Sequence, residues 1–415
     1  MAQRKIYVVK PETRRRCEIV PATEEAIRMF KEVSFELFHF FYQIDTIPFS
    51  IYFRVGDEII EFIRPEEHCA ELLDQISQAV TKEYENISIL MRFADMEAYA
   101  ALMNSVRKQK IDNLLKKDPA LDPKILDMFA DLSSASQMVV RGGITQEVDK
   151  KVKATAAQMV DTLMQSEVAI GTLTKMVLAD PTLYDHSASV AMIAGVIATK
   201  LLPQKKLQRE DAETVARSGL YHDVGKTCIP AAVLNKPGKF TPEEFEVMKT
   251  HTVLGYEELN KARTLGAPID ELVARVALEH HERFTGKGYP FGRKGRFEEH
   301  PNGIHLYTRI VTVADVYSAL LMERVYKPAY DAKDALAIMI KQAADEYDPD
   351  IFAPFLKHVI KSLDIQLDRD PNAPSAAAAA GRPAGKIIQT KGKDKPDKGK
   401  ILIIEDKKIT VKKPS

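Results

Sequence analysis

The chain has 415 residues, 45% of them hydrophobic, so it can form ordinary buried cores in two or three domains. Lysine plus arginine and aspartate plus glutamate both number 59, and this balance argues against DNA, RNA or an anionic membrane surface as the main partner. Three scattered cysteines, Cys17, Cys69 and Cys228, exclude a thiolate zinc site and a disulfide scaffold, and they fit a reducing compartment.

Two features bear on location. The first residues lack the apolar segment of a signal peptide. The longest apolar run, at residues 189–202, is shorter than the roughly 20 residues that span a bilayer. We therefore expect a cytoplasmic protein without a membrane span.

Residues 1–110 mix strand and helix patterns. Residues 5–10 and 49–63 favour strands, the second segment as a pair joined by a Gly-Asp turn signal. Residues 24–44 and 65–80 carry apolar residues at helical spacing. We predict a small N-terminal α/β domain with a regulatory or interaction role, because this region contains no catalytic constellation.

The next two regions are helical in pattern. Residues 111–174 resemble charged amphipathic helices, interrupted by the glycine pair Gly142 and Gly143. They are expected either to connect the flanking domains or to form a homodimer contact, and the sequence leaves both open. Residues 175–365 are expected to form an all-α bundle domain, so the fold class is α+β overall.

The composition changes near the C-terminal end. Residues 366–415 include an Ala-rich low-complexity stretch and a Lys-rich segment, which predict a flexible, mostly disordered tail. Residues 400–411 within this tail are strand-like. A short segment that docks on a sheet edge is the alternative for them.

Histidines recur on the apolar faces of the helices expected between residues 180 and 320. One buried histidine is usually a packed core residue, but several together carry repeated desolvation costs unless they share a partner. A metal cluster is such a partner, because neutral imidazole and carboxylate groups bind iron, manganese, zinc or nickel. The set comprises His186, His222 with the adjacent Asp223, His251, and the neighbours His280 and His281.

Residues 241–259 favour a single helix. Thr241 and Glu244 predict a capping box at its start, with proline at the first helical position. The series expected to face the core comprises Val247, His251 and Leu254.

Asp315 is expected in the middle of an apolar helix, where an unpaired carboxylate would be costly. It is interpreted as a metal ligand, because anionic ligands are otherwise scarce in the set. An ion pair with Arg309 or Arg324 is the alternative.

Several sequence blocks together indicate a family. HDVGK at 222–226, HTVLG at 251–255, HHERFTGKGYP at 280–290 and ADVYSAL at 314–320 occur in the order of an HD-GYP domain. Residues 175–365 thus resemble this group of the HD phosphohydrolases. The resemblance implies metal-dependent hydrolysis of cyclic di-GMP to pGpG, GMP or both, by a hydroxide activated between two metals, in bacterial second-messenger signalling.

The resemblance also implies roles for individual residues. Two divalent metals, iron or manganese, would be bound, with Asp223 bridging them. Asp223 and Lys226 would act in catalysis. The implied metal ligands are His186, His222, Asp223, His251, His280, His281 and Asp315, and the implied substrate contacts are Lys226, Gly288, Tyr289, Arg324 and Lys327.

Two positions depart from the family pattern. Thr285 and Ser318 each stand where the family usually has aspartate, and both positions support ligands or loops rather than bind metal. The departures keep two alternatives open: hydrolysis of another cyclic dinucleotide such as cyclic GMP-AMP, or a non-catalytic cyclic di-GMP receptor. For His300, His305 and His358 we expect surface or structural roles.

Overall fold

The computed structural model describes residues 7–9, 18–32, 44–55, 57–67, 88–179, 185–234, 236, 239–322, 330–366, 401–405 and 408–412. The chain divides into two compact units. One contains residues 1–103 and 374–415, and the other contains residues 104–373. Helix α4 (Met96–Lys117) runs across the boundary in the sequence.

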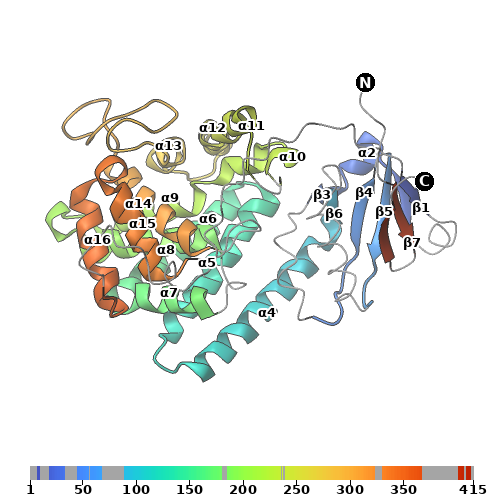
Figure 1. Cartoon of the computed structure of the whole chain (residues 1–415), viewed down its shortest axis with the longest axis horizontal. Helices are drawn as coiled ribbons and strands as arrows, with labels where there is room; N and C mark the ends of the chain where they lie inside the picture. Colours follow the sequence, from blue (N-terminus) through green and yellow to red (C-terminus); the bar gives the residue numbers. More distant parts are fainter. Residues whose placement is uncertain are drawn as a thin grey trace. The chain divides into compact units, whose positions relative to one another are not determined.

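The first unit contains a five-stranded antiparallel sheet with the strand order β2-β5-β4-β6-β3 (Figure 1). The expected strand pair at residues 49–63 is confirmed, with the turn at Asp57 between β4 and β5. The edge-to-face contact of Phe30 and Tyr52 packs one side of the sheet. The strands are β2 (Ile19–Pro21), β3 (Phe30–Glu32), β4 (Ile51–Val55), β5 (Glu58–Ile63) and β6 (Ser88–Arg92).

The prediction of a helix over residues 24–44 is wrong for the part that the structure describes. Only α2 (Glu24–Ile27) is helical, with Thr23 as its N-cap, and β3 follows almost at once. Phe30 is buried in the sheet, so pairing of β3 with β6 outweighs the local helical spacing. The second expected helix, at residues 65–80, lies almost wholly outside the described residues.

A second, three-stranded sheet joins distant parts of the sequence. Strand β1 (Tyr7–Val9) pairs in parallel with β7 (Ile401–Glu405), which pairs antiparallel with β8 (Lys408–Lys412) (Figure 1). The strand-like segment of the tail therefore pairs with a sheet strand, as the docking alternative expected. The low-complexity part of the tail lies outside the described residues.

The second unit is helical. Its longer helices are α5 (Pro123–Gly142), α6 (Gln146–Gln165), α7 (Ala169–Ala179), α8 (His186–Val196), α9 (Arg209–Tyr221), α11 (Pro242–Lys249), α12 (His251–Thr264), α13 (Glu271–Glu279), α14 (Leu306–Leu321), α15 (Ala332–Glu346) and α16 (Pro349–Ser362). Shorter elements include η4 (Ile197–Leu201), η5 (Pro203–Lys205), η6 (Val224–Cys228) and α10 (Ala231–Leu234).

Helix α8 is apolar on every side and lies in the middle of this unit, packed against α9 and α14 (Figure 1). Helices α5 and α6, from the segment expected as a connector, belong to the same hydrophobic core through residues such as Phe129 and Met159. None of the described helices is long and apolar enough to cross a membrane.

A buried polar network also ties α6 to α9. The Arg217 guanidinium donates to both carboxylate oxygens of Asp149, each at 2.9 Å, and the Tyr221 hydroxyl donates to the same carboxylate at 2.9 Å. The Asp149 and Arg217 side chains are buried, so each charge depends on the other. This network holds α9, which leads into the HDVGK block, in place.

The single helix expected at 241–259 is divided in two. The capping box of Thr241 and Glu244 is confirmed, but α11 ends at Lys249 and α12 begins at His251. Val247 is therefore exposed while His251 is buried, so the expected core-facing series does not hold across the break.

Candidate metal centre

The imidazole groups of interest lie at helix ends. His186 and His251 are the first residues of α8 and α12, and His222 directly follows α9. His280 and His281 follow α13. Asp315 alone comes from the interior of a helix, α14. Asp223 brings the set to seven side chains. They form two groups that could each hold a metal ion.

The first cluster consists of Asp223, His251, His280 and His281, whose ligand atoms all lie within 4.8 Å of one another. Asp223 Oδ1 lies 3.3 Å from His251 Nε2 and 3.7 Å from His280 Nε2. The two Nε2 atoms are 3.2 Å apart. Several nitrogen atoms thus converge on one carboxylate oxygen.

The second cluster consists of His186, His222 and Asp315. His186 Nε2 lies 3.1 Å from Asp315 Oδ1, and His222 Nε2 lies 3.8 Å from the same oxygen. The other oxygen of Asp223, Oδ2, lies 3.3 Å from His222 Nε2 and 3.7 Å from His186 Nε2. The two oxygens of Asp223 therefore face different clusters.

Adjacent histidines can share the first cluster because α13 ends before them. His280 occupies the C-cap position, and the chain leaves the helix at this point. The two rings lie 4.2 Å apart, centroid to centroid. On a continuing helix, neighbouring side chains would point about 100° apart.

Backbone carbonyl groups orient three of the rings. Nδ1 of His222, His251 and His280 contacts the carbonyl oxygen three residues earlier, at 2.7, 2.7 and 2.9 Å. A ring that donates from Nδ1 keeps the lone pair on Nε2, which is the atom that faces the clusters. This arrangement presents neutral nitrogen ligands.

Two buried atoms of the centre lack a hydrogen-bond partner among the described residues: His222 Nε2 and Asp223 Oδ1. A buried polar atom without a partner is costly in a folded protein. Both atoms belong to groups that coordinate divalent cations, so a bound cation would satisfy them. The residues present therefore fit a metal centre.

Electrostatics favours the ligand forms of His251, His281 and Asp223. Burial lowers the pKa of His251 to about 4 and lowers the pKa of His281 well below its usual range. Burial would raise the pKa of Asp223, but Lys226 and His222 outweigh it and hold that pKa well below normal. Neutral imidazole and ionised carboxylate are the forms that bind cations.

Asp315 belongs to the second cluster. Arg309, one of its alternative partners, instead donates to Glu298 at 2.6 and 2.7 Å and also to Asp348. The second alternative partner, Arg324, lies outside the described residues, as does the expected substrate contact Lys327. Ser318, one of the two departures, lies 3.1 Å from His186 Nδ1 and thus helps to orient that ring.

Lys226 lies beside the centre. Its ammonium group pairs with Asp223 Oδ2, and about a third of the side chain is exposed. The preceding Gly225 packs directly on α12. A Cβ atom there would lie 2.0 Å from the His251 carbonyl oxygen, so only glycine permits this approach.

The GYP loop reaches the first cluster through Tyr289. Its ring stacks on the His281 ring at 4.8 Å between centroids, and its backbone N–H donates to the His281 carbonyl at 3.1 Å. Gly288 makes the contact possible, since a Cβ atom there would lie 2.4 Å from the same carbonyl. The loop therefore packs directly against His281, a member of the first cluster.

The loop has further anchors that the sequence did not single out. The buried carboxylate of Glu282 accepts the backbone N–H groups of Phe291 and Arg293 at 2.7 and 2.8 Å. Thr285, the other departure, donates its hydroxyl to the Asp345 carbonyl at 2.9 Å. The only signal for Glu282 was its position directly after the two histidines.

Lys249 is a second residue that sequence reasoning missed. Its ammonium nitrogen lies over the Tyr289 ring, 5.8 Å from the centroid, and over the Phe245 ring at 5.5 Å. Lys249 is the last residue of α11, directly before the break that the sequence did not predict.

Comparison with known proteins agrees with this geometry. Residues 154–351 match the HD domain family. A probable cyclic di-GMP phosphodiesterase of Vibrio cholerae is 33% identical over 209 residues, covering 49% of this chain and 46% of the relative. The cyclic di-GMP phosphodiesterase response regulator RpfG of Xanthomonas campestris is 40% identical over 157 residues, 38% of each chain.

A third relative carries a different substrate in its name. The 3′3′-cGAMP-specific phosphodiesterase 3 of Vibrio cholerae is 36% identical over 172 residues, covering 41% of this chain and 34% of the relative. The chain therefore spans half or less of the length of these curated relatives. The region that matches the HD domain family, residues 154–351, contains the blocks that build the two clusters. The match to the HD domain family covers residues 154–351, and the similarity to these phosphodiesterases agrees with the resemblance to the HD-GYP group.

Proposed function

We propose that this protein hydrolyses the phosphodiester bonds of cyclic di-GMP to pGpG, GMP or both. The position of Asp223 between two ligand clusters is the observation that supports it most. One carboxylate that faces two sites matches a centre for two divalent cations, for which we propose iron or manganese. The names of the similar relatives support the substrate class.

The chemistry divides between the cations and the chain. Two cations bound in these clusters would supply an activated water molecule and bind a phosphate oxygen. The chain orients the ligand atoms through the carbonyl contacts of His222, His251 and His280. Lys226 places a positive charge next to Asp223, where it can neutralise a second phosphate oxygen as charge develops in the transition state.

Tyr289 and Lys249 are proposed to meet the nucleotide. Tyr289 is fixed against His281 by stacking and by a backbone hydrogen bond, so its position follows that of a metal ligand. The Lys249 ammonium lies over the same ring. Burial raises the pKa of Tyr289, so its hydroxyl stays protonated and can donate to a substrate oxygen.

The test is hydrolysis by purified full-length protein reconstituted anaerobically with iron(II) or with manganese(II). Cyclic di-GMP, 3′3′-cyclic GMP-AMP and cyclic di-AMP are offered separately, and products are separated by chromatography. We expect pGpG or GMP from cyclic di-GMP. Turnover confined to another dinucleotide would reassign the substrate. Binding of cyclic di-GMP without turnover in metal-loaded protein would instead indicate a receptor.

The control is the double variant His222→Ala/Asp223→Ala. It removes a ligand of the second cluster and the carboxylate shared by both clusters. Hydrolysis that persists in this variant would contradict the proposed centre. Circular dichroism of the variant shows whether the helices are retained.

A further inference from the structure

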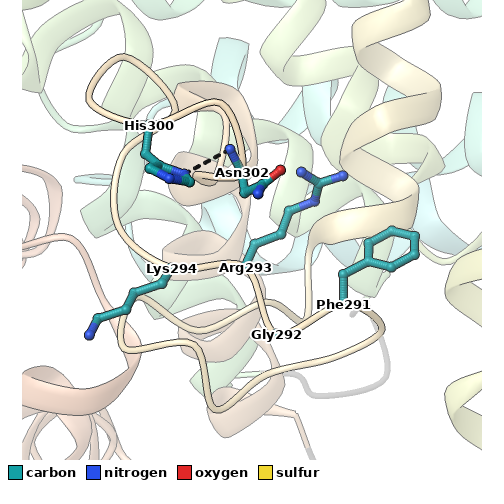
Figure 2. A pocket seen from close by; sticks show the side chains of 6 residues that line it. All are labelled: Phe291, Gly292, Arg293, Lys294, His300 and Asn302. Carbon is teal, nitrogen blue, oxygen red and sulfur yellow. Dashed lines mark hydrogen bonds between the residues drawn. The ribbon is translucent and has the colours of Figure 1, made fainter.

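A separate cavity lies in the loop that follows the GYP motif. It has a volume of about 670 Å³, within the range of roughly 300–1,000 Å³ typical of small-ligand sites. It shares no residue with either ligand cluster. The residues that line it are Phe291, Gly292, Arg293, Lys294, His300 and Asn302, none of them acidic (Figure 2).

The lining is rich in hydrogen-bond donors. Figure 2 shows the Arg293 guanidinium, the His300 ring and the Asn302 side chain on the same side of the loop, while the Lys294 side chain extends away from them. The Asn302 backbone N–H donates to His300 Nδ1 at 3.0 Å. The proton of the neutral His300 ring is therefore on Nε2, which is left to donate to a ligand.

The acidic residues of the same loop are already paired elsewhere. Glu298 accepts from Arg309, and Glu299 accepts from Arg296. Lys294 has no ion pair with any described residue. The positive charge of Lys294 is therefore not cancelled by the carboxylates nearest in sequence.

Arg293 is held from two sides. Its Nε lies 3.1 Å from the buried Glu279 carboxylate, and its backbone N–H donates to Glu282 at 2.8 Å. The exposed Phe291 ring lies beside it, 5.1 Å from the guanidinium carbon. The guanidinium is thus placed in advance, and a preorganised donor loses less entropy when it binds an anion.

We propose that this cavity binds a phosphate-bearing ligand, such as a nucleoside monophosphate, at a site separate from the metal clusters. Arg293, His300 and Asn302 donate to the phosphate, and Lys294 adds positive charge. The exposed Phe291 ring offers an apolar face to the rest of the ligand. The proposal does not depend on the proposed function, because none of these residues belongs to the metal centre.

The test uses isothermal titration of the full-length chain with GMP, inorganic phosphate and guanosine. The double variant His222→Ala/Asp223→Ala serves as the background, because it removes anion binding at the metal clusters. We expect GMP and phosphate to bind this background and guanosine to bind far more weakly. Adding Lys294→Glu or His300→Ala should weaken GMP binding by at least about tenfold, corresponding to about 1.4 kcal/mol.

Arg293 is left unchanged because Glu279 and Glu282, which hold it, flank the metal ligands. Lys261→Glu, on the exposed face of α12, is the control of equal charge change and should leave binding unaltered. Three results would overturn the proposal: no GMP binding at millimolar concentration, equal binding of guanosine, or undiminished binding in both cavity variants. Retained circular dichroism excludes unfolding as the cause of a loss.

Discussion

The two ligand clusters are built in different ways. In the first, His251 and His280 are oriented by backbone carbonyl groups three residues earlier in the chain. In the second, His186 contacts the side chain of Ser318, and Asp315 comes from the interior of α14. His222 of the second cluster is also oriented by a backbone carbonyl, but the positions of His186 and Asp315 rest on packing between α8 and α14.

This difference indicates which parts of the centre tolerate change. A ring held by a backbone carbonyl keeps its direction when neighbouring side chains vary. A ring held by a side chain depends on one hydroxyl group and on the spacing of two helices. We expect the second cluster to be the weaker metal site and the first to lose its metal last.

The largest expected effect comes from the residue common to both clusters. Asp223→Ala should lower kcat/KM by at least about 1,000-fold, since two-metal activation contributes several kcal/mol. Metal analysis should show that less than one ion remains per chain. Asp223→Asn, which keeps the shape and one oxygen, serves as the control for packing. Near-normal metal content in Asp223→Ala would show that the clusters are independent.

Removal of one histidine from each cluster tests the asymmetry directly. His251→Ala and His186→Ala should each lower activity by about 100-fold, because each removes a direct ligand. His186→Ala should lose its ion from the second cluster alone, as measured by metal stoichiometry. His358→Ala, a histidine outside both clusters, is the matched control. Equal loss of both ions in the two variants would remove the distinction between the clusters.

Ser318→Ala removes a contact that orients a ring of the second cluster but leaves every residue of both clusters in place. Loss of the contact with His186 Nδ1 should weaken one metal site by about tenfold, the lower end of the effect expected for groups that orient a ligand. The measurement is competitive metal titration with a fluorescent chelator. Ser318→Thr keeps the hydroxyl group and should restore affinity. If Ser318→Ala left affinity unchanged, the contact would have no part in holding the ring.

A lower pH should weaken metal binding at the two clusters to different extents, and this effect should be smaller than that of the substitutions. Burial alone would lower the pKa of His222, but the nearby Asp223 outweighs it and the pKa is raised, so this ring keeps a proton to higher pH. The pKa of His251 is lowered to about 4, so this ring is neutral in mild acid. As the pH is lowered from the range in which both rings are neutral, protons should compete first at His222 and weaken the second site before the first.

Metal titrations at successively lower pH measure the effect. Loss of the ion from the first cluster before the second would contradict the predicted order of proton competition. The His186→Ala variant should show a flatter pH dependence, because it binds an ion in the first cluster alone.

The sequence singled out the residues that form the two clusters, most of them through short motifs and His186 through its place on an apolar helix face. It could not predict how adjacent histidines share one cluster, since that depends on α13 ending at Glu279. The break at Thr250 was also missed, because the apolar spacing continues through it while the backbone does not. Lys249 consequently escaped notice.

The N-terminal unit was harder to predict. Residues 24–32 have helical spacing, yet only residues 24–27 form a helix, because residues 30–32 pair as β3 with β6. The pairing of β1 with β7 joins opposite ends of the sequence, and no local pattern specifies such a partner. Non-local contacts of this kind depend on the whole fold.

The close packing of Gly225 on the first turn of α12 has a consequence for genetics. A larger residue at this position would push two backbones apart and change the interval between Asp223 and His251 while leaving every ligand in the chain. In a mutational screen scored by activity, Gly225 would therefore rank with the ligands themselves. Only a metal-content assay would reveal that its role is to set a spacing.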